Sequence, residues 1–214
     1  MSLQSPIIVK MSLNLERIFL TGATGHIGTR LVQQLIKKGV QTTIYVRNET
    51  SVKHLFGEEL KSGLLTTAIG DYSTLDKYEK AIQGHTRLFT LLVTDFQKAA
   101  SMGELKRDLA QIAYKNGVRQ IVDLSSTSVR LYGKQGILGY IHAAGEQYLW
   151  NLAELNSKQR SLVILRPSFL MTNHLMTDVH SIKKENKIVS CGPSTAMLSW
   201  IDPKGTPSSS YHTQ

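Results

Sequence analysis

The chain of 214 residues contains 41% hydrophobic and 19% charged residues, a composition typical of a globular protein rather than a disordered or fibrous one. It is long enough for one sizeable core, or for one domain and part of a second. No apolar run approaches the roughly 20 residues of a membrane-spanning helix, which excludes a membrane protein. The single cysteine, Cys191, excludes an internal disulfide and an all-cysteine metal site. We expect it to be a small, half-buried residue in a reducing compartment.

The chain is basic, with 25 Lys and Arg against 16 Asp and Glu and a formal net charge of +9. A basic balance favours anionic partners, which include phosphorylated cofactors as well as nucleic acid. The basic residues are scattered, and the densest group is Lys183, Lys184 and Lys187. Because the sequence has no long basic block, zinc-ligand spacing or aromatic-rich RNA motif, we expect no nucleic-acid partner.

The two ends of the chain differ in composition from its middle. Residues 1–14 contain an apolar core of only four residues, Pro6–Val9, and Met11-Ser12-Leu13 repeats Met1-Ser2-Leu3. This segment is predicted to be an optional leader rather than a secretion signal, so the expected location is the cytoplasm. Residues 203–214 are polar, without apolar periodicity, and are predicted to be a disordered tail.

Between these ends, short β-branched segments alternate with amphipathic helical segments. Such alternation with short connections predicts a doubly wound α/β domain (a Rossmann fold) over residues 15–170, with a parallel sheet and helices on both faces. Its ligand is expected at the carboxyl ends of the strands. A capping pattern, Ser73-x-x-Asp76, predicts the start of the third helix. Strands are expected at residues 17–21, 41–47, 64–69, 88–93, 120–124 and 162–165, and helices at 27–38, 51–56, 74–82, 96–115 and 140–155.

A glycine-rich turn, TGATGHIG at residues 21–28, leaves the first predicted strand and enters the first predicted helix. This is the context that a dinucleotide-binding motif needs, although a glycine turn without a ligand is the alternative. Gly22 allows a tight turn, Gly25 lets the backbone approach a pyrophosphate, and Gly28 lets the helix pack closely on the strand. Backbone N–H groups at the start of the helix then face the anion. The predicted cofactor-binding residues of this turn are Gly22, Thr24, Gly25, His26, Ile27 and Gly28.

Arg47 ends the second predicted strand, 19 residues after Gly28, where the residue that reads the ribose is expected. A carboxylate there would accept hydrogen bonds from the 2′-hydroxyl of NAD, whereas arginine offers a planar cation to a 2′-phosphate. The sequence therefore predicts NADP rather than NAD, and the alternative is a solvated arginine. Lys53 and Arg30 are candidates to assist.

These motifs together resemble the NmrA-like family, atypical members of the short-chain dehydrogenase/reductase superfamily that are akin to isoflavone reductases and NADPH-dependent quinone reductases. The resemblance extends over residues 15–202, and its most specific mark is the segment LRPSFLMTN after the sixth predicted strand. The matching segments are the glycine turn, residues 46–48, the Gly70-Asp71 turn, residues 124–126 and residues 165–173.

The resemblance implies several further site residues. Asp71 would border the adenine, or else support the helix that follows it. Thr94 would line the nicotinamide side, while its neighbour Asp95 is equally a candidate helix N-cap. Ser125 would lie at the cofactor and hold the substrate carbonyl. Pro167 and Phe169 would line the cofactor pocket beyond the sixth strand, and Glu146 and Asn173 would be structural or pocket-lining residues.

The catalytic pair of the wider superfamily, Tyr-x-x-x-Lys, is absent, because Ala144 stands four residues after Tyr140. Without a nearby cation, Tyr140 is expected to be a poor proton donor. His142 is the other candidate, since a histidine that titrates near neutrality can deliver a proton. The alternatives are a tyrosine on a packed helix and a histidine without a catalytic role.

Two functions remain open at this point. One is an NADP(H)-dependent oxidoreductase that transfers a hydride to a small carbonyl, enone or quinone-type substrate near Ser125, Tyr140, His142 and Phe169. The other is a catalytically silent NADP(H) sensor that acts through a protein partner. Residues 171–202 are predicted to form only part of the family's small C-terminal substrate-side lobe. The short lobe and the missing lysine favour the sensor, whereas Tyr140, His142 and the segment after the sixth strand favour the enzyme.

Overall fold

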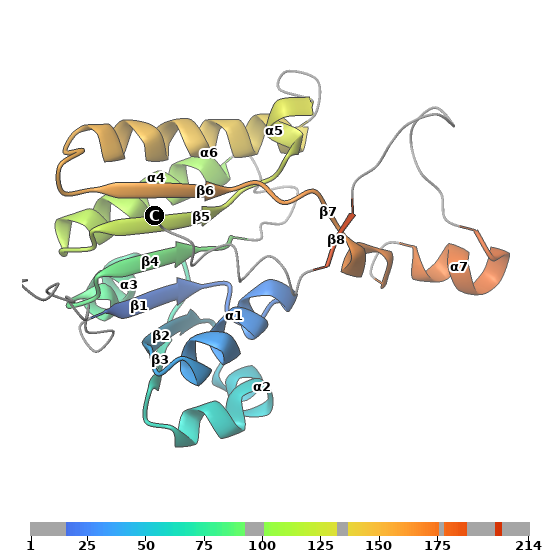
Figure 1. The fold of residues 1–214 in the computed structure, drawn as a ribbon, viewed down its shortest axis with the longest axis horizontal. Coiled ribbons are helices and arrows are strands. Elements are labelled where there is room, and N and C mark those ends of the chain that lie inside the picture. Colours follow the sequence, from blue (N-terminus) through green and yellow to red (C-terminus); the bar gives the residue numbers. More distant parts are fainter. Residues whose placement is uncertain (1–15, 93–100, 132–136, 176–177, 188–199, 203–214) are drawn as a thin grey trace, which may run out of the picture.

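The computed structural model describes residues 16–92, 101–131, 137–175, 178–187 and 200–202. A six-stranded sheet has the order β3-β2-β1-β4-β5-β6, and every neighbouring pair of strands is parallel (Figure 1). The doubly wound α/β fold predicted from the sequence is therefore confirmed. The winding reverses between β1 and β4, where sheets of this kind bind their ligands. The strands are β1 (Arg17–Thr21), β2 (Gln41–Val46), β3 (Leu65–Ile69), β4 (Arg87–Thr90), β5 (Gln120–Leu124) and β6 (Ser161–Leu165).

Helices cover both faces of this sheet (Figure 1). Helices α1 (His26–Lys37) and α2 (Glu49–Lys61) lie on one face, and α3 (Asp76–Ile82), α4 (Met102–Lys115) and α6 (Ile137–Glu154) lie on the other. Side chains alternate between the two faces along each strand. In β1, Leu20 joins the core under α1 and α2, while its neighbour Phe19 joins the core under α3, α4 and α6.

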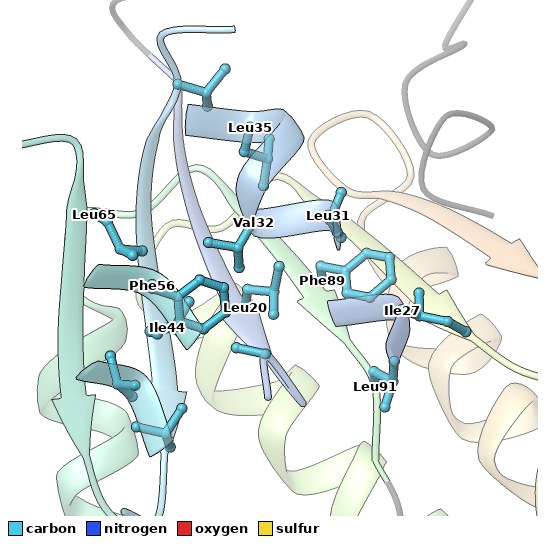
Figure 2. Close-up of a cluster of buried hydrophobic side chains, with 14 of the residues drawn as sticks. Leu20, Ile27, Leu31, Val32, Leu35, Ile44, Phe56, Leu65, Phe89 and Leu91 are labelled. Atoms are coloured by element: carbon cyan, nitrogen blue, oxygen red, sulfur yellow. The ribbon is translucent and has the colours of Figure 1, made fainter. Parts of the chain in front are cut away.

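The core under α1 shows why this segment becomes a helix in this place (Figure 2). Leu31, Val32 and Leu35 form the apolar stripe of α1, and each is at most 2% exposed. They pack over β1, β2 and β4, and Phe56 of α2 closes the cluster. Full burial of one such side chain contributes about 1.5–3 kcal/mol to folding. This packing fixes α1, and with it the turn that precedes the helix.

Several predicted boundaries differ from the structure. β2 ends at Val46, so Arg47 follows the strand, and β4 ends at Thr90 rather than at residue 93. Helix α2 continues past the predicted end at Phe56, where its backbone is kinked with φ −130°. The capping prediction for α3 is wrong, because Leu75 is the N-cap residue and no side chain caps the helix. Ser73 belongs instead to the loop before the helix, where its hydroxyl donates to the Asp71 carboxylate at 2.6 Å.

Beyond β6, the described chain forms smaller elements that lie past the carboxyl ends of the sheet (Figure 1). Strands β7 (Phe169–Leu170) and β8 (Trp200–Ile201) pair in parallel, and Arg30 of α1 forms an ion pair of 3.3 Å with Asp202 just after β8. The short helix α7 was not expected from the sequence. The remaining elements are α5 (Ser128–Leu131), the 3-10 helix η3 (Met171–Leu175) and α7 (Val179–Glu185).

Some sequence predictions concern other parts of the chain. The leader at residues 1–14, the tail at 203–214, Thr94, Asp95 and Cys191 lie outside the described residues. Within the described ranges, no helix has the length and apolar character needed to cross a membrane. The same ranges contain no group of three or more His, Cys, Asp or Glu side chains that could hold a metal ion.

Candidate cofactor site and the buried charged cluster beside it

A cavity of about 260 Å³ opens at the carboxyl ends of β1 to β4, at the point where the winding of the sheet reverses. Three of the six residues predicted for the glycine turn line it, and so does Arg47. His26 is exposed at the start of α1, Ile27 packs into the core, and Gly28 packs against the turn, so these three offer the cavity no side chain. The lining residues are Gly22, Ala23, Thr24, Gly25, Tyr45, Val46, Arg47, Gly70, Tyr72, Leu91 and Leu92.

The glycines of the turn are required for different reasons. A Cβ at Gly28 would overlap the carbonyl oxygen of Gly22, so the contact between α1 and the turn requires glycine at this position. Gly25 is different, because its φ of −83° suits any residue and a Cβ there would meet only the Gly22 carbonyl oxygen, at 3.5 Å. Neither backbone conformation nor packing within the described protein requires glycine at 25. Close approach of a bound group to the backbone does explain it.

The electrostatics of the cavity favour an anion. Helix α1 starts at its edge, with no side-chain cap on Gly25 and no acidic residue in the first turn, so its N-terminal partial positive charge is not neutralised locally. Arg47 is exposed and is the one charged side chain among the lining residues. The other candidate cations are engaged elsewhere: Lys53 pairs with Glu49 at 3.2 Å, and Arg30 pairs with the C-terminal segment.

The structure places Asp71 outside the lining of this cavity. Its carboxylate accepts hydrogen bonds from the backbone N–H of Ser73 at 2.9 Å and from the Ser73 hydroxyl at 2.6 Å. These hydrogen bonds lower the pKa of Asp71, and the charges of Lys77 and Arg47 add to the effect. The geometry therefore agrees with the alternative stated for Asp71, an acidic residue that shapes its own loop.

A second group of polar side chains lies at the carboxyl ends of β5 and β6. The Ser125 hydroxyl donates to Oε1 of Glu146, and Arg166 donates to both oxygens of the same carboxylate, at 2.9 Å through Nε. Burial by itself raises the pKa of Glu146, but these hydrogen bonds and the charges of Arg166 and Lys106 outweigh it and leave the pKa lowered. Glu146 is thus an ionised, buried carboxylate that holds Ser125 and Arg166 in place. The O–H group of Ser125 donates its hydrogen bond to Glu146 and is not available to donate to another group.

A buried ion pair adjoins this group. Nζ of Lys106 in α4 lies 2.7 Å from Oδ2 of Asp123 in β5, and both side chains are fully buried. The Thr90 hydroxyl donates to the other oxygen of Asp123 at 2.8 Å. This pair was not predicted from the sequence. Two signals were available: an acid inside the apolar segment QIVDL, and a lysine spaced four residues after Met102 and three before Leu109 on the inner face of α4.

The two residues proposed as proton donors lie in different surroundings. Tyr140 is 66% exposed on α6. His142 is half-buried, and its Nδ1 is buried without a hydrogen-bond partner among the described residues. Burial first, and the charge of Lys106 second, lower the pKa of His142 below its usual value near 6.5. This shift favours the uncharged ring, which weakens the case for His142 as a charged proton donor near neutrality.

Pro167 and Phe169, predicted from the resemblance to border the cofactor, lie beyond β6 and do not line the cavity. The carbonyl oxygen of Pro167 accepts a hydrogen bond from the backbone N–H of Thr127 at 3.0 Å. This bond ties the segment after β6 to the segment after β5. Phe169 is 45% exposed in β7.

Comparison with known proteins settles the family. The model of the NAD(P)H-binding family matches residues 22–192. The chain belongs to the NAD(P)H-binding family. This match covers the glycine turn, the cavity and the buried charged cluster, and it agrees with the dinucleotide-binding domain that the glycine turn predicted.

Individual relatives agree with this assignment at the level of the fold. The chain is 30% identical over 113 residues to sterol demethylase protein B of Methylococcus capsulatus, a match of 50% of this chain and 33% of that protein. Pen from Bacillus thuringiensis superposes with a TM-score of 0.75 at 15% identity, over 90% of this chain and 63% of that one. The Citrobacter sp. triphenylmethane reductase, complexed with NADP(H), gives 0.69 at 18% identity, over 89% and 62%. This chain thus spans a third of the curated relative and under two thirds of these two structures.

Seven residues of this NAD(P)H-binding protein line the cavity but were not predicted as site residues: Ala23, Tyr45, Val46, Gly70, Tyr72, Leu91 and Leu92. The Tyr45 hydroxyl donates to the backbone carbonyl of Asp71 at 2.8 Å, and its ring lies 5.7 Å from that of Tyr72. Burial raises the pKa of Tyr72 to about 12. Both phenols therefore stay protonated and form a neutral, aromatic wall beside Arg47. The aromatic positions at the end of β2 and after the Gly70-Asp71 turn were the available signal.

The Glu146–Arg166 pair predicts a pH-dependent stability. Because the folded-state pKa of Glu146 is lowered, its stabilisation is present above the usual glutamate pKa of 4.5 and is lost as the pH falls below it. We expect Arg166→Met to lower the free energy of unfolding by about 2–3 kcal/mol at pH 8, since it leaves a buried carboxylate without its partner. Urea unfolding of both proteins at pH 8 and at pH 4 should show the difference shrinking at the lower pH.

Lys61→Met is the matched control, because Lys61 forms an exposed pair with Glu58 in α2. Its effect should stay below about 1 kcal/mol at both pH values. An Arg166→Met effect as large at pH 4 as at pH 8 would contradict the assignment of the stabilisation to ionised Glu146.

Proposed function

We propose that this chain is an NADP(H)-dependent reductase that acts on a small carbonyl, enone or quinone-type substrate. The observation that carries the proposal is the combination of Gly25 and Arg47 in one cavity. Gly25 is a glycine that the fold itself does not require, and Arg47 is an exposed cation without an ion-pair partner in the described part of the chain. The likeness to a reductase whose structure contains NADP(H) supports it.

Each part of the cavity suits one part of the cofactor. The backbone at Thr24 and Gly25 and the N-terminus of α1 offer N–H donors and partial positive charge to the pyrophosphate. Arg47 offers its guanidinium to the 2′-phosphate, and the rings of Tyr45 and Tyr72 offer a neutral wall to the adenosine half. NADPH, when bound, supplies a hydride, and the protein supplies orientation and electrostatics.

The substrate end of the proposed site lies at the carboxyl ends of β5 and β6, where Ser125 and His142 stand, with Tyr140 and Phe169 as exposed neighbours. Because the Ser125 hydroxyl donates to Glu146, the oxygen of Ser125 acts here as a hydrogen-bond acceptor. The half-buried His142 is then the residue whose ring N–H is available to donate a hydrogen bond to the substrate. Thr94 remains a proposed residue of the nicotinamide side.

The second candidate is a sensor that binds NADP(H) without turnover and signals through a protein partner. Two observations favour it: no lysine stands four residues after Tyr140, and the Ser125 hydroxyl is committed to Glu146. We expect the purified protein to oxidise NADPH with at least one member of a panel of quinones, enones and aldehydes. Tight NADPH binding in a calorimetric titration, without oxidation across the panel, would select the sensor instead.

The role of the glycine turn is tested by Gly25→Val. The branched side chain would occupy the space that the proposal assigns to the pyrophosphate, so we expect NADPH affinity to fall by at least about 100-fold, the loss of roughly 3 kcal/mol. The control is Gly57→Val in α2, where a Cβ meets no atom within 4 Å and which does not line the cavity. Isothermal calorimetry on variants with unchanged circular dichroism measures both. If Gly25→Val bound NADPH as tightly as the wild type, the assignment of the cofactor to this cavity would be contradicted.

The cofactor preference is tested at Arg47. A charge-assisted hydrogen bond to a phosphate contributes roughly 1.5–3 kcal/mol net, so NADP should bind about ten- to 100-fold tighter than NAD. Arg47→Ala should erase most of this difference and leave NAD affinity nearly unchanged, since NAD lacks the 2′-phosphate. Higher salt should also narrow the preference, because Arg47 is exposed and its ion pair is screened.

Lys53→Ala is the matched control for Arg47→Ala. It removes the same charge from a side chain that pairs with Glu49 and does not line the cavity, so the NADP preference should remain. Equal affinity of the wild type for NAD and NADP would reduce Arg47 to a surface arginine and overturn the choice of cofactor.

A further inference from the structure

Lys106 takes an unusual course through the core. It leaves α4, passes α6 at Gly145, and reaches Asp123 on β5 with its side chain fully buried. A Cβ at position 145 would lie 3.1 Å from Cδ of Lys106, and one at Gly103 would lie 3.3 Å from the backbone nitrogen of Gly145. The close contact of α4 and α6 at these two glycines therefore leaves room for the aliphatic part of the lysine.

Stability alone does not account for this arrangement. Removing two charges from water costs several kcal/mol per ion, and replacing a buried ion pair by apolar residues of similar volume is often neutral or stabilising. The fold nevertheless supplies both ions with partners: Lys106 donates to Asp123 and, at 3.4 Å, to the carbonyl oxygen of Leu124, while Thr90 donates to Asp123. A buried, hydrogen-bonded ion pair next to a candidate site suggests a role in that site.

His142 is the residue on which this pair acts. It lies on α6, one turn before Glu146 and three residues before Gly145. The charges that act on its ring are Lys106 from α4, Asp123 from β5 and Glu146 from α6 itself, and among them Lys106 acts most strongly. Its buried Nδ1 has no hydrogen-bond partner among the described residues. A proton on Nδ1 would thus be a buried donor without an acceptor, close to a second positive charge.

We propose that Lys106 is a positioning residue that holds His142 as a neutral imidazole with its single proton on Nε2. The buried ammonium opposes a second proton on the ring. Because no described residue accepts a hydrogen bond from Nδ1, the single proton resides on Nε2. Asp123 holds the ammonium in place through their ion pair of 2.7 Å. Because Gly145 has no side chain, the aliphatic part of Lys106 can pass α6 and reach this position.

For the substrate, a consequence follows that rests on the proposed function. A neutral imidazole with Nε2–H donates one hydrogen bond and carries no charge, and the nearby cations Lys106 and Arg166 are each held by a carboxylate. This end of the site therefore suits an uncharged oxygen, such as a ketone or quinone carbonyl, better than a carboxylate. It also predicts reductase turnover that does not depend on the ionisation of His142 between pH 6 and pH 8.

The test is nuclear magnetic resonance of the histidine rings in the cofactor-free protein, with His142 assigned through His142→Gln. Long-range ¹H–¹⁵N spectra report both charge and tautomer. In the wild type we expect neutral His142 with the Nε2–H pattern from pH 6 to pH 8. Lys106→Met should raise its titration midpoint by about one pH unit or more, because the repelling charge is gone while Asp123 and Glu146 remain.

The double variant Lys106→Met/Asp123→Leu guards against a single variant that fails to fold, since it replaces the whole pair by apolar side chains. Its His142 midpoint should fall between those of the wild type and Lys106→Met, because Asp123 acts in the opposite direction and more weakly. Lys115→Met, on the exposed end of α4 in a pair with Glu79, is the control and should leave His142 unchanged.

His85 provides an internal reference in the same spectra. Its Nδ1 lies 3.0 Å from the carbonyl oxygen of Ile82, so it should show the Nδ1–H pattern in every variant. A wild-type His142 with the Nδ1–H pattern, a wild-type midpoint at or above 6.5, or a midpoint that Lys106→Met and the double variant leave in place would overturn the proposal. None of these measurements requires NADPH or turnover, so failure of the proposed function would be seen separately, in the Gly25→Val and Arg47→Ala titrations.

Discussion

The contact of α1 with the turn before it sets the geometry of the cofactor side. Because Gly28 has no side chain, the first turn of α1 rests directly against the carbonyl of Gly22. That contact directs the stripe of Leu31, Val32 and Leu35 onto the sheet and the helix N-terminus toward the cavity. Any Cβ at position 28 would separate the helix from the turn, and the N–H donors at the start of α1 would then move away from the cavity. The cavity is thus a consequence of helix–strand packing.

A second close approach, between α4 and α6, organises the other end. Gly103 and Gly145 bring the two helix backbones together, and the aliphatic part of Lys106 passes through the same interface. The buried carboxylates of Asp123 and Glu146 then collect the polar groups that the carboxyl ends of β5 and β6 bring there. In both places, a glycine with an ordinary φ marks where another group lies against the chain: the Gly22 carbonyl at Gly28, the Lys106 side chain at Gly145 and, as proposed, a cofactor at Gly25.

The fold was predictable from the sequence because its signals are local and repeated. Apolar runs of four to six residues, helical stripes and a glycine turn fix a parallel sheet with helices on both faces, and five of the six strands were placed within one residue at both ends. The cavity residues Gly22, Gly25 and Arg47 follow from the same turn chemistry. The start of α3 was misplaced because Ser73 lies in the loop that Asp71 shapes, where its hydroxyl donates to that carboxylate, and the helix begins only after Leu75.

The pairings within the buried cluster could not be predicted from the sequence, because they are tertiary contacts. Its members come from α4, β5, α6 and the segment after β6, and no spacing along the chain shows that Lys106 faces Asp123 or that Ser125 faces Glu146. The histidine on α6 illustrates the consequence. From the sequence alone, His142 is expected to titrate near neutrality like other histidines. In the fold, burial and the charge of Lys106 from another helix lower its pKa.

The two halves of the site differ in how their charges are balanced, and this difference bears on what each can bind. At the cofactor side, Arg47 and the N-terminus of α1 have no carboxylate partner in the described chain, so their charge is available to an anion. At the other end, Lys106 and Arg166 are neutralised by Asp123 and Glu146, and their charge orients neighbours instead of attracting a ligand. A dinucleotide phosphate gains from the first arrangement and would gain little from the second. An uncharged carbonyl oxygen suits the end near Lys106 and Arg166, because both cations there already have a carboxylate partner. The proposed site would thus bind the anionic part of the cofactor at one end and a neutral oxygen at the other.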